Sequence, residues 1–340
     1  MSLHRHEAGR SLRKGLLTAC LLALGSGCKG LEATAPAKPP SAGAAGGLTS
    51  VAFVDGLRIL GDASGRVRLD SETAPPRWLA AHSGPVRFVG RWSPSKHGEA
   101  GPWVYATASH DGTVAFFDEA LNVVSRHRLP DAHLNAATAY GDRVAVAADR
   151  GLVAMFGPTG LVWSRTGLHG AAAYAVVFSI DGAELVAGGM DGHVSRLRVT
   201  DGVSLGEHPS GGAWITAMVH GVEGLYVGRA DGSLQMVNPL DGVVLRELEP
   251  QNAAVRACLL TPTILVCGAE DGGLSACDRH TKAACTMLQT HAPVRALATA
   301  RDQIVVAGAD GRLRVYGAVG ATLTLRQTEQ PWDTTKTSND

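Results

Sequence analysis

Short hydrophobic runs alternate with tight-turn signals along most of the chain. In the stretch YAVVFSIDGAELVAGGMDG (174–192), two apolar runs are each followed by an Asp-Gly pair. Apolar runs of this length, bounded by turn residues, are typical of β-strands, and glycine after Asp tolerates the positive φ of a hairpin turn. The stretch therefore predicts strands joined by tight turns, and the chain shows no long amphipathic helical pattern.

The same turn recurs at a nearly constant interval. Its glycine stands in the stretches DASGRVRLD, SHDGTVAFFD, ADRGLVAMFG, GMDGHVSRLRV, RADGSLQMVN, AEDGGLSACD and GADGRLRVYG. The seven glycines, separated by 47, 39, 41, 40, 40 and 39 residues, are Gly65, Gly112, Gly151, Gly192, Gly232, Gly272 and Gly311. A period near 40 residues is typical of propeller blades.

Each repeat unit contains four short strand patterns. In the last unit they cover residues 294–300, 303–309, 312–316 and 322–327. No connection is long enough for a crossover helix, so the strands pair antiparallel, and radial packing against neighbours covers both faces of so small a sheet. The pattern predicts an all-β fold, a seven-bladed β-propeller of four-stranded antiparallel blades over residues 48–327. The ring closes either with four consecutive strands in each terminal unit or with an edge strand supplied from upstream of Leu48.

The repeat units resemble WD repeats. FSIDGAELVAGGMDGHV (178–194), HSGPVRFV (82–89) and ASHDGTVAFFD (108–118) carry the resemblance. The tryptophan that this family places before a closing Asp is replaced by Phe117, Phe156, Leu197, Val237, Cys277 or Tyr316. The family's histidine before the first strand occurs only as His82, His133, His169 and His291, so its hydrogen-bond network is incomplete in every blade. The resemblance implies a propeller that acts as a protein–protein scaffold.

The corners between the third and fourth strands resemble a second propeller family. FGPTGLVW (156–163), LRVTDGVSL (197–205) and VNPLDGVVL (237–245) are similar to corners of quinoprotein-like propellers, which include lipoproteins of the outer-membrane protein assembly apparatus. This resemblance implies the same fold. It also implies an alternative function, in which the chain is a lipoprotein component of such an assembly apparatus.

The N-terminal segment has the pattern of a targeting signal. Basic residues precede the apolar stretch GLLTACLLALGSG (15–27), which is too short to span a bilayer. Cys28 follows, and the whole resembles a bacterial lipoprotein signal, in which the cysteine is lipidated. We expect a signal peptide over 1–27, a flexible tether over 28–47 and a disordered tail over 328–340. The expected location is the bacterial cell envelope, with the N-terminal lipid as the only membrane anchor; an ordinary secretory signal is the alternative.

Composition and charge exclude several classes of function. The chain has 31 Lys and Arg against 31 Asp and Glu, so no nucleic-acid partner is predicted. None of the 13 histidines has a metal-binding spacing, and neither a Gly-x-Ser-x-Gly elbow nor a phosphate-binding glycine loop is present. We expect no enzyme activity, cofactor or metal site; a propeller with enzymatic or sugar-binding chemistry at its channel mouth is the alternative. The carboxylates before five turn glycines are interpreted as turn caps, namely Asp111, Asp191, Asp231, Asp271 and Asp310.

Four cysteines fall in the sixth unit, one in each strand pattern. The register of the last unit places Cys258 directly opposite Cys267, and the corner after the third strand brings Cys277 near Cys285. An envelope location would permit disulfides. We therefore hypothesise the bonds Cys258–Cys267 and Cys277–Cys285, with four buried thiols as the alternative.

One position in the first strand of every unit is polar, although its neighbours are mostly apolar. The seven residues there are Thr49, Arg87, Asn135, Tyr174, Thr216, Arg256 and Arg295. Because this strand is the innermost one of a propeller, we expect their side chains to line one mouth of the central channel. They form either a solvated wall or a binding rim.

The binding-rim hypothesis predicts an acidic partner. Three arginines make the rim positive and can hold a carboxylate by bidentate contacts, and two tryptophans nearby in sequence are candidate hot spots. The insert RWSPSKHGEAGPW (91–103) is a further candidate contact loop. The predicted function is a non-enzymatic scaffold that binds an envelope protein or peptide through one rim. The predicted contact residues are Arg87, Arg256, Arg295, Tyr174, Asn135, Trp78 and Trp214.

Overall fold

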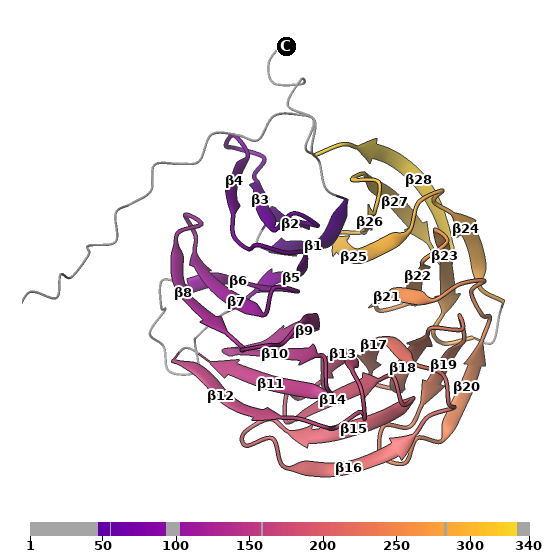
Figure 1. Ribbon diagram of the computed structural model, residues 1–340. Helices are drawn as coiled ribbons and strands as arrows, with labels where there is room; N and C mark the ends of the chain where they lie inside the picture. The colour runs from indigo at the N-terminus through magenta and orange to yellow at the C-terminus, as the bar shows by residue number, and fades with distance from the viewer. Residues whose placement is uncertain (1–46, 55, 93–102, 158, 282–283, 332–340) are drawn as a thin grey trace, which may run out of the picture. The chain divides into compact units, whose positions relative to one another are not determined.

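The computed structural model describes residues 47–54, 56–92, 103–157, 159–281 and 284–331. These residues form seven separate four-stranded sheets, arranged as blades around a central channel (Figure 1). Every sheet is antiparallel and contains four strands that follow one another in the sequence. The predicted seven-bladed β-propeller is therefore confirmed. Within these ranges, no helix has the length and apolar character needed to cross a membrane.

The blades have one strand order, and we name the strands of each blade a to d from the channel outwards. Blade 1 contains β1 (Leu48–Val54), β2 (Leu57–Asp62), β3 (Arg66–Asp70) and β4 (Arg77–Ala80). Blade 2 contains β5 (Val86–Arg91), β6 (Trp103–Ser109), β7 (Thr113–Asp118) and β8 (Val123–Arg128). Blade 3 contains β9 (Leu134–Tyr140), β10 (Arg143–Ala148), β11 (Leu152–Gly157) and β12 (Gly160–Arg165). Blade 4 contains β13 (Ala173–Phe178), β14 (Glu184–Gly189), β15 (His193–Arg198) and β16 (Ser204–Pro209).

The remaining three blades repeat this arrangement. Blade 5 contains β17 (Ile215–Gly221), β18 (Gly224–Arg229), β19 (Leu234–Val237) and β20 (Val244–Leu248). Blade 6 contains β21 (Val255–Leu260), β22 (Ile264–Ala269), β23 (Gly273–Asp278) and β24 (Thr286–Gln289). Blade 7 contains β25 (Val294–Ala300), β26 (Gln303–Gly308), β27 (Leu313–Val319) and β28 (Thr322–Glu329).

The conformation of the turn between strands b and c follows from its recurring Asp and Gly positions in the repeat. All seven turn glycines have a positive φ, between 60° and 89°, which explains why the repeat keeps glycine there. Each of the five aspartates before these glycines accepts a hydrogen bond from the backbone N–H two residues later, over 2.8 to 3.2 Å. Their interpretation as turn caps is confirmed.

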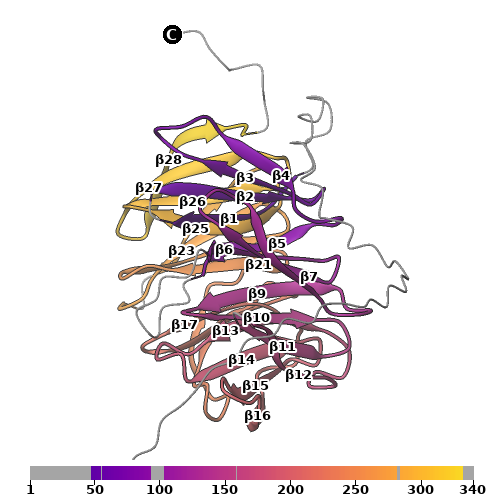
Figure 2. The same ribbon diagram turned by 90° about the vertical axis from the view of Figure 1, so that its left-hand side faces the viewer.

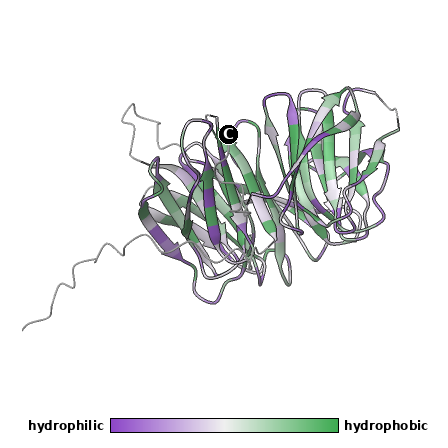
Figure 3. Cartoon of the chain, turned by 90° about the horizontal axis from the view of Figure 1, so that it is seen from above, coloured by the Kyte–Doolittle hydropathy of each residue, from purple (hydrophilic) through white to green (hydrophobic). Residues whose placement is uncertain are grey.

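The hydrophobic core lies between neighbouring blades. Phe116 of blade 2 and Phe156 of blade 3 are buried in one cluster, and Tyr226 of blade 5 shares another with Cys267 of blade 6. Figure 3 shows the hydrophobic residues concentrated in the strands. Burying one such aromatic side chain contributes on the order of 2 kcal/mol, so each blade depends on its neighbours for its core.

The first and last blades close the ring with side chains. Leu48 and Leu60 of blade 1 pack against Leu313 of blade 7, and Arg58 Nη1 lies 2.5 Å from Glu329 Oε2. Both views of the ribbon place β1 beside β25 (Figures 1 and 2). Each terminal sheet uses four consecutive strands, so the alternative of an exchanged strand is wrong for the described residues. The last strand ends at Glu329, two residues beyond the predicted boundary.

Several predicted features lie outside the described residues. They are the signal over 1–27, Cys28, the tether up to residue 46, most of the insert at 93–102 and the tail from residue 332.

Candidate functional site

The seven polar residues of the inner strands surround one pocket at a mouth of the channel. The pocket has a volume of about 210 Å³, and two alanines of β9 complete its lining. Its polar lining residues are Thr49, Arg87, Asn135, Tyr174, Thr216, Arg256 and Arg295. The structure therefore brings together all seven residues that the repeat alignment selected.

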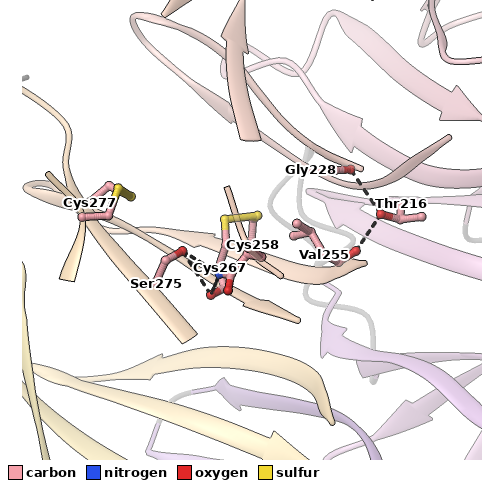
Figure 4. The surroundings of a disulfide bond; sticks show 9 residues. Thr216, Gly228, Val255, Cys258, Cys267, Ser275 and Cys277 are labelled. Atoms are coloured by element: carbon pink, nitrogen blue, oxygen red, sulfur yellow. Dashed lines mark hydrogen bonds between the residues drawn. A yellow bond between two sulfur atoms is a disulfide. The ribbon is translucent and has the colours of Figure 1, made fainter. Parts of the chain in front are cut away.

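Three of these side chains join neighbouring blades. Thr49 Oγ1 donates to the carbonyl oxygen of Val86 over 2.7 Å, and Asn135 Nδ2 donates to a carbonyl of blade 4 over 3.1 Å. Thr216 Oγ1 donates to Val255 O over 2.6 Å (Figure 4). Each bond runs from one inner strand to the next blade, so these residues help to hold the ring together.

Two arginines of the pocket share a single carboxylate. Arg295 Nη1 and Nη2 contact the two oxygens of Glu270 over 2.6 and 2.9 Å, and Arg256 Nε contacts Glu270 Oε2 over 2.6 Å. Glu270 stands in the turn between β22 and β23. Burial by itself would raise the pKa of this carboxyl, but the hydrogen bond from Arg295 and both positive charges outweigh it and hold the pKa below its ordinary value.

Arg87 is the uncompensated cation of the pocket. Within the described residues it makes no hydrogen bond or ion pair, although it lines the same pocket as the paired arginines. Burial and the nearby charges of Arg295 and Arg256 lower the pKa of Arg87, yet a guanidinium stays protonated at neutral pH. Glu270 binds two of the three guanidinium groups, and Asp149 accepts a hydrogen bond from the pocket residue Asn135 over 3.0 Å. Three arginines against these two carboxylates leave the pocket with an excess of positive charge.

An aromatic pair stands at the side of the pocket formed by blades 4 and 5. The rings of Tyr174 and Trp214 are stacked, with centroids 6.3 Å apart and planes inclined by 20°. Trp214 lies in the loop before β17 and is 45% exposed. This pair offers a flat apolar surface next to the positive pocket.

The other predicted tryptophan is not at the channel mouth. Trp78 lies in β4, the outermost strand of blade 1, where it is paired with Arg68 and packs on the cluster that closes the ring. Its closeness in sequence to β5 misled the prediction, because strand d lies at the opposite edge of the blade from strand a. We therefore remove Trp78 from the candidate contact residues.

The four histidines before inner strands have two different environments. His82 is buried, its Nδ1 and Nε2 lie 2.6 and 2.7 Å from the hydroxyls of Thr113 and Thr107, and burial lowers its pKa to about 4. His169 is also buried and contacts Asp191 through Nδ1 over 3.1 Å. His133 and His291 are exposed. His133 Nδ1 nevertheless lies 3.2 Å from the carbonyl oxygen of His110, so three of the four histidines make the expected contact with a blade, and two of these three are buried.

Blade 6 contains two disulfide bonds. Cys258 lies directly opposite Cys267 in the β21–β22 pair, and a disulfide joins them (Figure 4). A second disulfide joins Cys277 to Cys285. The bonds connect strand a to strand b, and strand c to the start of strand d. Cys267 and Cys277 are buried in the cluster between blades 5 and 6, so the sulfur atoms are also part of the core.

Comparisons with known proteins establish the fold. No protein-family model matches the chain, and no curated protein matches it. A crystal structure of the computationally designed Ika8 protein is similar, with 22% identity, a TM-score of 0.64, and coverage of 84% of this chain and 88% of that chain. Sqt1 of Saccharomyces cerevisiae is similar with 14% identity, a TM-score of 0.67, and coverage of 82% and 84% respectively. Identities this low show the propeller fold alone, and the WD-repeat resemblance stays a prediction.

Proposed function

We propose that this chain is a non-enzymatic scaffold that holds a carboxylate-bearing segment of a partner protein at the channel mouth. The observation that carries the proposal is the group of three arginines, of which Glu270 binds only two. The Glu270 contact supports this proposal, because Arg295 binds that carboxylate with both terminal nitrogens. Arg87 offers an incoming carboxylate the same chemistry without a competing internal partner.

The size of the pocket favours a single acidic side chain or a chain end. Sites for drug-sized ligands and cofactors commonly measure about 300–1,000 Å³. The pocket of about 210 Å³ is smaller, and its polar lining suits a carboxylate. The exposed Trp214 and its neighbour Tyr174 would cover apolar parts of the same segment, as aromatic residues commonly do at the centre of protein interfaces.

The proposed location is the bacterial cell envelope. It is supported by the lipoprotein-like leader that ends at Cys28 and by the Pro- and Ala-rich stretch that follows. A partner from the envelope fits both this location and the scaffold role. The quinoprotein-like corners make an outer-membrane protein assembly apparatus the alternative setting, and the identity of the captured partner separates the two.

The carboxylate preference is tested with a labelled hexaglutamate peptide. Fluorescence anisotropy compares the wild type with the triple variant R87E/R256E/R295E. We expect saturable binding to the wild type, weakened by added salt, and no binding to the variant, because repulsion replaces attraction at the pocket.

A matched triple variant controls for net charge. R128E/R198E/R326E changes three exposed arginines on strands c and d, so the overall charge falls by the same amount. We expect this control to bind the peptide like the wild type. If both triple variants lose hexaglutamate binding equally, the pocket has no specific role. The same holds if the wild type binds a hexaglutamine peptide as tightly as hexaglutamate.

A further inference from the structure

Blade 4 contains a group of potential metal ligands away from the channel pocket. Asp191 stands in the turn between β14 and β15, His193 begins β15, and Glu207 lies in β16. One ligand atom from each residue lies within 4.8 Å of the other two. The Asp191 Oδ2 and His193 Nδ1 atoms are 3.9 Å apart, and the same Nδ1 lies 3.1 Å from the backbone oxygen of Asp191. A ring nitrogen that donates to a carbonyl leaves Nε2 as the atom that can bind a metal ion.

The strand register explains why these side chains meet. In the β15–β16 pair, Glu207 lies directly opposite Ser195, so both project from one face of the sheet. His193 precedes Ser195 by two residues and projects from the same face. The turn adds Asp191, whose Oδ1 accepts hydrogen bonds from the His193 backbone N–H over 3.0 Å and from His169 Nδ1 over 3.1 Å.

The remaining carboxylate oxygens of the group are uncommitted. Within the described residues, no hydrogen bond uses Asp191 Oδ2 or either carboxylate oxygen of Glu207, and Glu207 is exposed. The Asp191 carboxylate is nevertheless oriented, because its other oxygen is held by two donors. An oriented and unused oxygen beside an imidazole is what a metal ion requires.

The same positions in blade 5 lack this feature. Asp231, Ser233 and Glu247 occupy them there, and all three are bound by protein groups. Ser233 Oγ donates to Asp231 Oδ1 over 2.7 Å, and Gln235 Nε2 donates to Glu247 Oε1 over 2.7 Å. The aspartates of the two blades are alike, with two donors on Oδ1, so the blades differ in the bonded Glu247 against the unbonded Glu207 and in the histidine that replaces the serine.

We propose that Asp191, His193 and Glu207 bind one divalent transition-metal ion of the zinc class. One imidazole and two carboxylates suit zinc, whereas magnesium and calcium prefer oxygen ligands alone. Bond lengths of about 2.0–2.2 Å are compatible with the observed grouping after small side-chain rotations. The ion connects the turn to the outermost strand of blade 4, and three protein ligands leave one position for water or a group from a partner. Sequence spacing missed the site because its ligands come from a turn, from the start of strand c and from strand d.

Zinc titration of the full chain tests the site. After removal of metals by chelation, isothermal calorimetry compares the wild type with H193A and E207Q. We expect saturable binding of one zinc ion by the wild type and at least a tenfold loss of affinity in either variant. His4 and His6 are present in all these proteins, so any contribution from them is shared.

Two controls separate the site from general surface binding. H208A removes the neighbouring histidine of β16, and E247Q removes the equivalent carboxylate of blade 5. Both should bind zinc like the wild type. Zinc should raise the midpoint temperature of thermal unfolding for the wild type and leave that of H193A unchanged. The unfolding transition of H193A also shows whether this variant is folded. Unchanged zinc affinity in H193A, or no saturable binding by the wild type, would overturn the proposal.

Discussion

The inner strands use one position in two different ways. In blades 1, 3 and 5 this position is occupied by Thr49, Asn135 and Thr216. Each of these side chains donates a hydrogen bond to a backbone carbonyl of the next blade. In blades 2, 6 and 7 the residue is arginine, and in the described part of the chain no such bond joins these arginines to the next blade. The position therefore bonds to the backbone of the next blade in blades 1, 3 and 5 and supplies positive charge in blades 2, 6 and 7, where the Arg295–Glu270 pair also joins blade 7 to blade 6.

Two of the blades with arginine carry additional bonds within the blade. In blade 2, His82 connects the loop before β5 to hydroxyl groups of β6 and β7. In blade 6, the Cys258–Cys267 bond connects β21 to β22. Among the three arginines, only Arg87 has no internal partner in the described part of the chain. The contrast separates residues that stabilise the ring from residues that would recognise a partner, and each prediction below tests one side of it.

The largest expected effect is on acid stability, through His82. Its pKa in the fold is about 4, against an ordinary 6.5, because burial and Arg126 outweigh the attraction of Asp111. The unfolded chain therefore takes up a proton between pH 6.5 and pH 4 that the folded protein does not, and stability falls as the pH decreases through this range. The shift corresponds to on the order of 3 kcal/mol.

The variant H82Q isolates this contribution. Gln251 occupies the equivalent place before blade 6, where its Nε2 donates to Ser275 Oγ over 2.7 Å, so glutamine is compatible with the fold. Urea unfolding at pH 7, 5.5 and 4.5 should give a smaller pH dependence for H82Q than for the wild type. Equal slopes would show that His82 does not remain neutral in the fold.

The second effect concerns the unpaired arginine. R87M should weaken binding of hexaglutamate roughly 30-fold, because a charged hydrogen bond contributes about 2 kcal/mol. R256M should have a smaller effect, since Glu270 already occupies that guanidinium. Anisotropy titrations measure both, with R128M in β8 of the same blade as the control. Equal losses in R87M and R256M would remove the distinction between free and paired arginines.

The third predicted effect is a gain in affinity for hexaglutamate rather than a loss. E270Q removes the carboxylate that Arg256 and Arg295 share, so the positive charge of the pocket rises. We expect up to a tenfold gain in affinity for hexaglutamate, which is about 1.4 kcal/mol. The exposed Glu249 provides the control E249Q, which makes the same change of net charge away from the pocket. Weaker binding by E270Q would mean that Glu270 mainly positions the arginines.

The smallest effect belongs to the residues that hold the ring. T216V preserves the shape of the side chain but removes the hydrogen bond to Val255 O, and should lower the free energy of unfolding by about 1 kcal/mol. Hexaglutamate affinity should not change. The control is T299V, because Thr299 is an exposed threonine of the inner strand β25. A loss of peptide binding in T216V would contradict the division between the two groups of blades.

Periodicity was sufficient to predict the fold and much of the pocket lining. The turn glycines set the repeat, the repeat aligned the inner strands, and the alignment identified all seven polar residues of the pocket. It also placed Cys258 opposite Cys267, because hairpin register follows from a two-residue turn. These features depend on local rules that every blade obeys.

Features that depend on loop paths were not predictable in this way. Glu270 was missed, since it occupies an ordinary turn position before Asp271, and only the structure shows that this position faces the arginines. Trp78 was misplaced because strand d lies at the opposite edge of a blade from strand a, although only residues 81–85 separate β4 from β5. His133 and His291 precede inner strands as His82 and His169 do, but their side chains are exposed, which the sequence pattern did not distinguish.

The most direct test of the binding claim is photocrosslinking in intact cells. A benzophenone amino acid at position 174 replaces a tyrosine of the pocket lining and leaves the three arginines in place. Mass spectrometry then identifies the crosslinked segment, in the wild-type background and in R87E/R256E/R295E. We predict a segment rich in Asp or Glu that is lost in the triple variant. Crosslinks that persist in that variant, or that join position 174 to basic segments, would contradict the account.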